Sequence, residues 1–146
     1  MGFLGFLDNN TVYLDTAPII YYVEDTSPYA DLLESVFQAV KSNSLRACTA
    51  TLTLAETLVV PYRKKNEELR KKFEVLLTKT PDLTMLPLTP EIARETAKIR
   101  AEFSIKTPDA VQLATARING IDYFLTNDKE LKIFSNLRIV LLDDFV

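Results

Sequence analysis

The chain has 146 residues, of which 47% are hydrophobic and 25% charged, and it carries a net charge of −3 with a pI near 5.0. Strong nucleic-acid binders usually carry a basic surplus, so any RNA contact has to come from a local basic patch. The absence of histidine, together with a single cysteine at Cys48, excludes a Ser-His-Asp triad, a Cys-His pair, a His/Cys zinc site and RNA cleavage by two histidines.

Residues 1–10 form an apolar extension ahead of the first predicted strand. The apolar run ends at Asp8 and is too short for a signal peptide with its cleavage site. No other stretch approaches the roughly 18 apolar residues of a membrane span, and a single cysteine, which forms no internal disulfide, agrees with a reducing compartment. We therefore expect a cytoplasmic protein without membrane attachment. The apolar residues of the extension should pack on the body of the domain or on a partner: Phe3, Leu4, Phe6 and Leu7.

Hydrophobic patterns predict strands that alternate with helices. The first strand covers residues 11–14 and ends at Asp15, and Thr16 and Pro18 then favour a helix start, because Thr can cap a helix and Pro suits its first turn. A second helix begins near Pro28, where apolar residues at 3–4 spacing form one stripe: Tyr29, Leu32, Leu33, Val36, Phe37 and Val40. The remaining predicted elements are a strand at 45–50, a helix from 51 that ends near Pro61, a helix at 66–78, a strand at 84–88, a helix at about 89–103, a helix from 107 to the cap at 119–120, and strands at 122–126 and 137–142.

Strands separated by helices require crossover connections, which produce a parallel sheet with helices on both faces. We therefore predict an α/β fold of three α/β/α layers with a mostly parallel sheet of four to five strands. No linker or internal repeat divides the chain, so the prediction is one domain over residues 1–146. In sheets of this kind, ligands bind beyond the carboxyl ends of the strands.

Acidic residues follow three of the predicted strands, and one more begins the helix that leads into the fourth. These acids are Asp15, Glu56, Asp109 and Asp128. Each has a structural explanation on its own. Asp15 and Asp128 can cap helices, and Asp109 suits the first turn of its helix. Glu56 can close a capping box with Thr53, although a carboxylate among Leu, Ala and Val is costly without a cationic partner.

Taken together, the four acids predict a metal site at one edge of the sheet. Oxygen-only ligands select hard cations such as Mg²⁺ or Mn²⁺ rather than zinc. A bound cation also explains how several carboxylates can lie together without repelling one another. A metal held there can activate water and stabilise charge on a phosphate, so these acids are the candidate catalytic and metal-binding residues.

Four stretches of the sequence resemble the PIN-domain nucleases. They are VYLDT at 12–16, TLAET at 53–57, TPDAVQLATA at 107–116 and FLTND at 124–128. The third stretch is the most specific and the second the least. The likeness covers nearly the whole chain and is strongest to the small VapC-type toxins of prokaryotic toxin–antitoxin pairs.

The resemblance implies a PIN-like fold and a Mg²⁺- or Mn²⁺-dependent endoribonuclease. It assigns Asp15, Glu56, Asp109 and Asp128 to the acidic quartet of the family, and Thr126 to the polar residue that accompanies the last acid. It also implies a homodimer and a protein antitoxin that places a basic side chain in the acidic site. The extension at residues 1–10 departs from many relatives, which begin directly with the first strand.

Arg63, Lys64 and Lys65 are candidate RNA-binding residues. They follow the helix that carries the second acid and could guide phosphates toward the site, with a solvated helix end as the alternative. For Lys71 and Lys72 we favour ordinary helix pairs with the acids four residues earlier.

Other enzymes also place an Asp after a first strand. A haloacid-dehalogenase-type phosphotransferase needs a second Asp two residues later, where this chain has Ala17. A phosphorelay receiver needs paired acids near the first strand, whereas Asp143 and Asp144 lie near the last residues. Two alternatives to a toxin stay open: a PIN-like RNA- or protein-binding module with weak or no cleavage, and an RNA-processing nuclease outside toxin–antitoxin systems.

Overall fold

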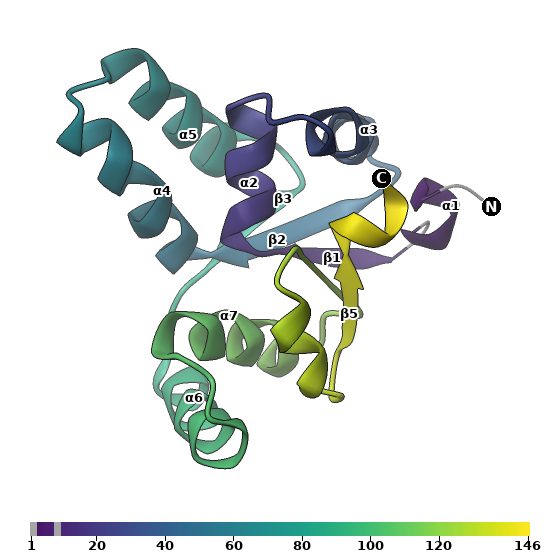
Figure 1. Ribbon diagram of the computed structural model, residues 1–146, viewed down its shortest axis with the longest axis vertical. Helices are drawn as coiled ribbons and strands as arrows, with labels where there is room; N and C mark the ends of the chain where they lie inside the picture. Colours follow the sequence, from purple (N-terminus) through teal and green to yellow (C-terminus); the bar gives the residue numbers. More distant parts are fainter. Residues whose placement is uncertain (1–2, 8–9) are drawn as a thin grey trace.

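A five-stranded parallel sheet forms the centre of the computed structural model, which describes residues 3–7 and 10–146 (Figure 1). The strands are β1 (Thr11–Leu14), β2 (Arg46–Ala50), β3 (Leu83–Leu86), β4 (Tyr123–Thr126) and β5 (Arg138–Leu141). Their spatial order is β3-β2-β1-β4-β5, and every pairing is parallel. The chain thus builds the sheet outward from β1 in one direction and returns to add β4 on the other side of β1. The predicted fold class is confirmed, with a sheet that is parallel throughout.

Helices cover both faces of this sheet. They are α1 (Phe3–Leu7), α2 (Thr16–Val23), α3 (Tyr29–Lys41), α4 (Thr51–Arg63), α5 (Glu67–Lys79), α6 (Pro90–Phe103) and α7 (Thr107–Ile118), and the short 3-10 helices are η1 (Lys129–Ile133) and η2 (Leu142–Phe145). Figure 1 shows α2, α3 and α5 on one side of the sheet and α6 and α7 on the other. Within residues 3–7 and 10–146, no helix has both the length and the apolar character that crossing a membrane requires.

Strand β1 is buried on both faces, as expected for the central strand of a doubly covered parallel sheet. Val12 and Leu14 belong to the core beneath α2, α3 and α5. Tyr13 points to the opposite core, beneath α6 and α7, where its ring stacks on Phe124 with centroids 5.1 Å apart. The alternation along β1 therefore ties the two helix layers to one sheet.

The apolar N-terminal extension packs on the body of the protein through α1. Phe3 and Leu7 are both buried, and the Phe3 ring lies 4.7 Å from the ring of Phe145 near the end of the chain. Leu4 is partly exposed, at 37%. The side chain of Phe6, which was expected to pack in the same way, lies outside the described part of the structure.

Element boundaries differ from the predicted ones mainly at prolines. Helix α4 runs to Arg63 instead of ending near Pro61, because the hydrogen bond from Lys64 N to Val60 O (2.9 Å) continues the helix past the N–H that proline lacks. Strand β3 ends at Leu86, just before Pro87, since proline cannot donate to the ladder.

Candidate active site

The four acids singled out in the sequence line one cavity of about 390 Å³ at the ends of β1 and β4. Its lining residues are Asp15, Thr16, Ala17, Tyr21, Glu56, Asp109, Thr126, Asn127 and Asp128. The strand order reverses between β1 and β4, and such a switch point opens a ligand crevice at the carboxyl ends of the strands. The acids come from four separate segments: the start of α2, the middle of α4, the first turn of α7 and the loop after β4.

Asp15 is both a helix cap and a member of this cavity. Its Oδ1 accepts a hydrogen bond from Thr16 N (2.8 Å), and its Oδ2 accepts one from the hydroxyl of Thr126 (2.8 Å). Burial raises the pKa of Asp15 from 3.8 to about 6, the two hydrogen bonds oppose this increase, and the charges of Asp109 and Glu56 add to it. The carboxylate is therefore held in one orientation while its charge is unfavourable without a cation.

Thr126 connects the first and last acids. Its hydroxyl, fully buried, donates to Asp15 and accepts a hydrogen bond from Asp128 N (3.2 Å). The Asp128 side chain in turn caps η1 by accepting from Glu130 N at 3.0 Å. As with Asp15, the capping role that the sequence suggested for Asp128 coexists with a place in the cavity.

Glu56 is held by neutral donors. Its Oε1 accepts hydrogen bonds from the Thr16 hydroxyl (2.7 Å) and from Gln112 Nε2 (3.3 Å). The capping box with Thr53 is not formed, because α4 begins at Thr51 and the Thr53 hydroxyl lies 2.7 Å from that of Thr49. The interpretation of Thr16 as a cap was also wrong, since Thr16 is the first residue of α2 and its hydroxyl is committed to Glu56.

Asp109 completes the set from the first turn of α7. It is half-buried, and its pKa is raised, chiefly by burial and then by the negative charges of Asp128 and Glu56, with Lys106 opposing the increase. The position at a helix N-terminus stabilises its charge only in part. Two acids of one cavity thus have raised pKa values, and a bound cation would oppose both increases.

The donor set of the cavity fits a hydrated divalent cation. All its charged groups are carboxylates, the ligands that Mg²⁺ and Mn²⁺ prefer. In the described part of the chain, no three acidic, His or Cys side chains lie close enough together to hold an ion directly. A cation there would contact one or two of the carboxylates and reach the others through water, as Mg²⁺ commonly does in proteins.

Sequence reasoning missed Gln112, a buried residue that does not line the cavity but contacts two residues that do. This residue is 1% exposed and lies three positions after Asp109, hence on the same side of α7. Its amide contacts both Glu56 and Thr16. The three-residue spacing between Asp109 and Gln112 was the only signal in the sequence that could have indicated this role. A glutamine at that spacing does not by itself indicate a contact with the acids.

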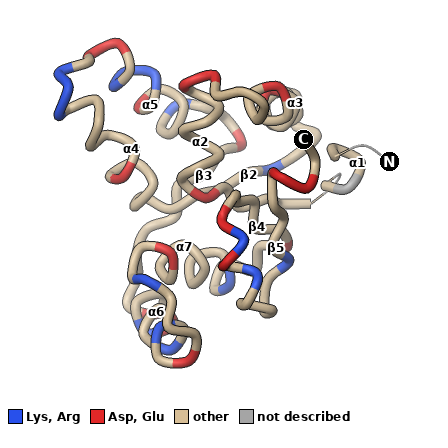
Figure 2. Tube along the Cα trace, in the orientation of Figure 1, with Lys and Arg blue, Asp and Glu red and all other residues tan. Residues whose placement is uncertain are grey.

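The basic residues Arg63, Lys64 and Lys65 lie at the turn between α4 and α5, and all three are exposed. Figure 2 shows this blue turn at the outer end of the α4–α5 pair. None of the three lines the acidic cavity. Arg63 is seven residues beyond Glu56 on α4, which places it on the same side of the helix at a distance of about 10 Å along the axis.

The pairs expected on α5 are formed in part. Lys72 lies 3.7 Å from Glu68, as predicted. Glu67 instead pairs with Arg70 at 3.0 Å, and Arg70 also contacts Glu74. Among the described residues, Glu67 is therefore in an ion pair with Arg70 and not with Lys71, the partner that the four-residue spacing suggested.

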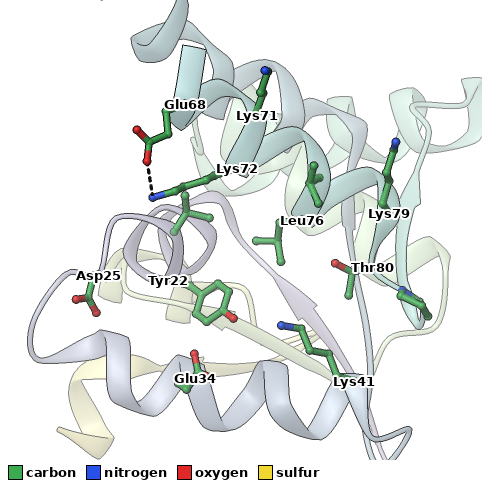
Figure 3. Close-up of a pocket in the computed structure, with 13 residues that line it drawn as sticks. Tyr22, Asp25, Glu34, Lys41, Glu68, Lys71, Lys72, Leu76, Lys79 and Thr80 are labelled. Carbon is green, nitrogen blue, oxygen red and sulfur yellow. Dashed lines mark ion pairs between the residues drawn. The ribbon is translucent and has the colours of Figure 1, made fainter. Parts of the chain in front are cut away.

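A larger cavity of about 890 Å³ lies between α5 and the segment that contains α2 and α3 (Figure 3). Figure 3 shows Tyr22 and Leu76 among lysines, including Lys41 and Lys79, with Lys72 paired to Glu68. The lining includes Lys41, the last residue of α3 before β2, and Thr80 and Pro81, which precede β3, so this cavity lies toward the amino ends of these two strands. Crevices for ligands of parallel sheets form at the opposite edge, where the four acids are.

Comparisons with known proteins agree with the fold. A family model described as PIN domain matches residues 12–137. VapBC2 from Rickettsia felis bound to a promoter DNA fragment has a similar structure, with a TM-score of 0.74 and 18% identity over 90% of this chain and 98% of that chain. DNA-bound VapBC from Salmonella typhimurium is also similar (TM-score 0.68, 21% identity, 91% and 98% covered). So is VapC20 from Mycobacterium tuberculosis, a sarcin–ricin loop cleaving toxin (TM-score 0.69, 13% identity, 87% and 98% covered). No match is found among curated proteins.

Proposed function

The chain belongs to the PIN-domain family, and from this premise we propose that it is a Mg²⁺- or Mn²⁺-dependent endoribonuclease. Asp15, Glu56, Asp109 and Asp128 are its proposed catalytic and metal-binding residues. The observation that carries the proposal is that these four carboxylates, from four separate segments, line a single cavity at the switch point of the sheet. The proposed unit of function is one nuclease domain over residues 1–146.

The chain's own residues would prepare this cavity for a cation and a phosphate. The hydroxyls of Thr126 and Thr16 orient the carboxylates of Asp15 and Glu56, so that little reorganisation is needed when a cation enters. The raised pKa values of Asp15 and Asp109 reflect a charge cluster that a cation would relieve. When bound, such a cation supplies activation of water and neutralises the charge that develops on the phosphate. Arg63, Lys64 and Lys65 would contact RNA phosphates beyond the cavity.

We also propose that the nuclease is the toxin of a toxin–antitoxin pair. The similarity in fold to VapBC proteins supports this assignment. An antitoxin with a basic side chain would complement the four carboxylates of the cavity electrostatically and would block it. The family resemblance further favours a homodimer, which sedimentation at micromolar concentration would test.

Cleavage of total RNA with and without Mn²⁺ and EDTA tests the proposed activity. We expect cleavage by the wild-type protein in Mn²⁺, none in EDTA, and none by Asp15→Asn under either condition. Asp144→Asn is the matched control, because Asp144 is an exposed acid paired with Lys132 (3.6 Å) outside the cavity. Cleavage that persists in EDTA or in Asp15→Asn would contradict the proposal, and RNA binding without any cleavage would identify a binding module instead.

A further inference from the structure

Gln112 lies at the centre of a buried polar network behind the acidic cavity. Its Oε1 accepts a hydrogen bond from the hydroxyl of Tyr13 on β1. Its Nε2 lies 3.0 Å from the Thr53 hydroxyl, 3.1 Å from the Thr16 hydroxyl and 3.3 Å from Glu56 Oε1. The network therefore joins β1, α2, α4 and α7 at one side chain.

The surroundings of Gln112 determine which way its amide points. A carboxylate only accepts hydrogen bonds, so the amide must present its N–H groups to Glu56. The opposite orientation would place Oε1 against the Glu56 carboxylate, with two acceptors facing each other. The Tyr13 hydroxyl donates to Oε1 from the other side and reinforces the same orientation.

These contacts act on one oxygen of Glu56. Oε1 receives both the Thr16 hydroxyl and the Gln112 amide. Among the described residues, Oε2 has no hydrogen-bond partner, while Glu56 as a whole lines the cavity. The two donors thus fix the rotation of the carboxylate and leave its second oxygen available.

We propose that Gln112 is a positioning residue, which holds Glu56 so that its second oxygen is presented to a divalent cation in the cavity. This inference rests on the proposed function, because it assumes that Glu56 is a metal ligand. Tyr13 acts one step further back by holding the Gln112 amide. Loss of such a supporting hydrogen bond typically reduces metal affinity or activity by about 10- to 100-fold.

Mn²⁺ binding, measured by the loss of the EPR signal of free Mn²⁺, tests this proposal without depending on RNA cleavage. Gln112→Met keeps the length of the side chain and removes its donors, so we expect the Kd for Mn²⁺ to rise by at least about 10-fold. Tyr13→Phe should raise the Kd less. In the Gln112→Met background, Tyr13→Phe should not change the Kd further, because Tyr13 influences Glu56 only by holding the Gln112 amide, which this variant lacks.

The double variant separates positioning from simple stability. Gln112→Met alone takes one acceptor away from Tyr13, and adding Tyr13→Phe removes that mismatch, so the melting temperature should recover toward that of the wild type. Mn²⁺ affinity should not recover. Thr96→Val is the control for loss of a buried hydroxyl away from the cavity, where Thr96 donates to Ile92 O at 2.8 Å, and it should bind Mn²⁺ as the wild type does.

Two results would overturn the role of Gln112: wild-type Mn²⁺ affinity in the double variant, or no measurable Mn²⁺ binding by the wild-type protein. A wild-type protein that binds Mn²⁺ but cleaves no RNA would contradict the proposed nuclease function. In that case the effect of Gln112→Met on Mn²⁺ affinity would still decide whether Gln112 positions Glu56.

Discussion

The hydroxyl of Thr126 donates a 2.8 Å hydrogen bond to Asp15 Oδ2 across a sequence separation of 111 residues. The parallel register of β1 and β4 produces this contact, because it pairs Leu14 with Leu125 and so brings Asp15, which directly follows β1, next to Thr126, the last residue of β4. The same hydroxyl accepts from Asp128 N. One side chain thus links the ends of the two strands between which the cavity opens.

Replacing Thr126 by valine should weaken both stability and cleavage. Valine keeps the shape but removes the donor to a buried carboxylate, which should lower the free energy of unfolding by about 1–3 kcal/mol at neutral pH. Cleavage should fall by about 10- to 100-fold, since Asp15 loses its orientation. Thr126→Ser keeps the hydroxyl and should retain most of both. Denaturant unfolding and initial cleavage rates measure the two effects, and equal rates for the valine and serine variants would exclude this role of the hydroxyl.

The raised pKa of Asp15 predicts a specific pH dependence of stability without metal. Between about pH 4 and pH 6 the folded protein retains a proton on Asp15 that the unfolded chain has released, so this group lowers the free energy of unfolding as the pH rises through that interval. Each pH unit between the pKa values of the unfolded and folded states corresponds to about 1.4 kcal/mol, so the free energy of unfolding should fall by an amount on the order of 3 kcal/mol once the pH is above the pKa of Asp15 in the folded protein. Asp15→Asn removes the effect and should be as stable as the wild type, or more stable, above pH 6.

Urea unfolding in EDTA across this interval would measure that dependence. The stability difference between Asp15→Asn and wild type should grow up to about pH 6 and then level off. Asp144→Asn, at an exposed position, should parallel the wild type. Parallel curves for all three proteins would contradict a raised pKa at Asp15.

Added Mn²⁺ should stabilise the wild-type protein more than either Asp15→Asn or Asp109→Asn. A ligand at about 100 times its Kd stabilises the folded state by about 2.7 kcal/mol, which corresponds to a rise of about 5–10 °C in Tm for a chain of this size. Both variants should lose cleavage as well. Thermal melts in EDTA and in Mn²⁺ provide the comparison, with Asp144→Asn as the control. If Asp15 and Asp109 serve only as cap and dipole residues, all four proteins will respond equally to Mn²⁺.

Removing the charges at the α4–α5 turn should weaken RNA binding without affecting the fold. The combined variant Arg63→Gln, Lys64→Gln and Lys65→Gln should change stability by less than about 0.5 kcal/mol, because all three residues are exposed. For single-stranded RNA, the slope of log K against log salt concentration should decrease by about 0.7 for each lost phosphate contact.

Binding at several salt concentrations, in the Asp15→Asn background to prevent cleavage, would measure this slope. The control variant is Lys71→Gln with Lys72→Gln, since these lysines lie on α5 and Lys72 is paired with Glu68. An equal decrease in both variants would indicate a general effect of net charge rather than a phosphate track.

The N-terminal helix should contribute to stability through Leu7. This side chain is fully buried, and Leu7→Ala should lower the free energy of unfolding by about 2–5 kcal/mol. Leu4→Ala on the same helix, at a residue that is 37% exposed, is the matched control and should cost much less. Denaturant unfolding measures the loss of free energy of unfolding in both variants. Similar losses for Leu7→Ala and Leu4→Ala would mean that α1 does not belong to the core.

The sequence by itself determined the kinds of elements and the positions of the acids along them. Apolar runs of strand length and 3–4 spacing are local patterns, so the alternation of strands and helices and the parallel sheet followed from them. Asp15 and Asp128 were recognisable because each closely follows a strand. Asp109 was recognisable because it lies in the first turn of a predicted helix.

Only the tertiary structure decided the contacts that these residues make with other side chains. The periodicity of apolar residues indicates that a strand face is buried, but not which strand lies beside it. The strand order β3-β2-β1-β4-β5 was therefore not predictable from local pattern, and this order brings Asp15 next to Thr126. The burial of α1 and the Gln112 network depend on the same long-range packing. Hydrogen bonds between side chains nearly 100 residues apart form only after the sheet has fixed the distance between their backbones.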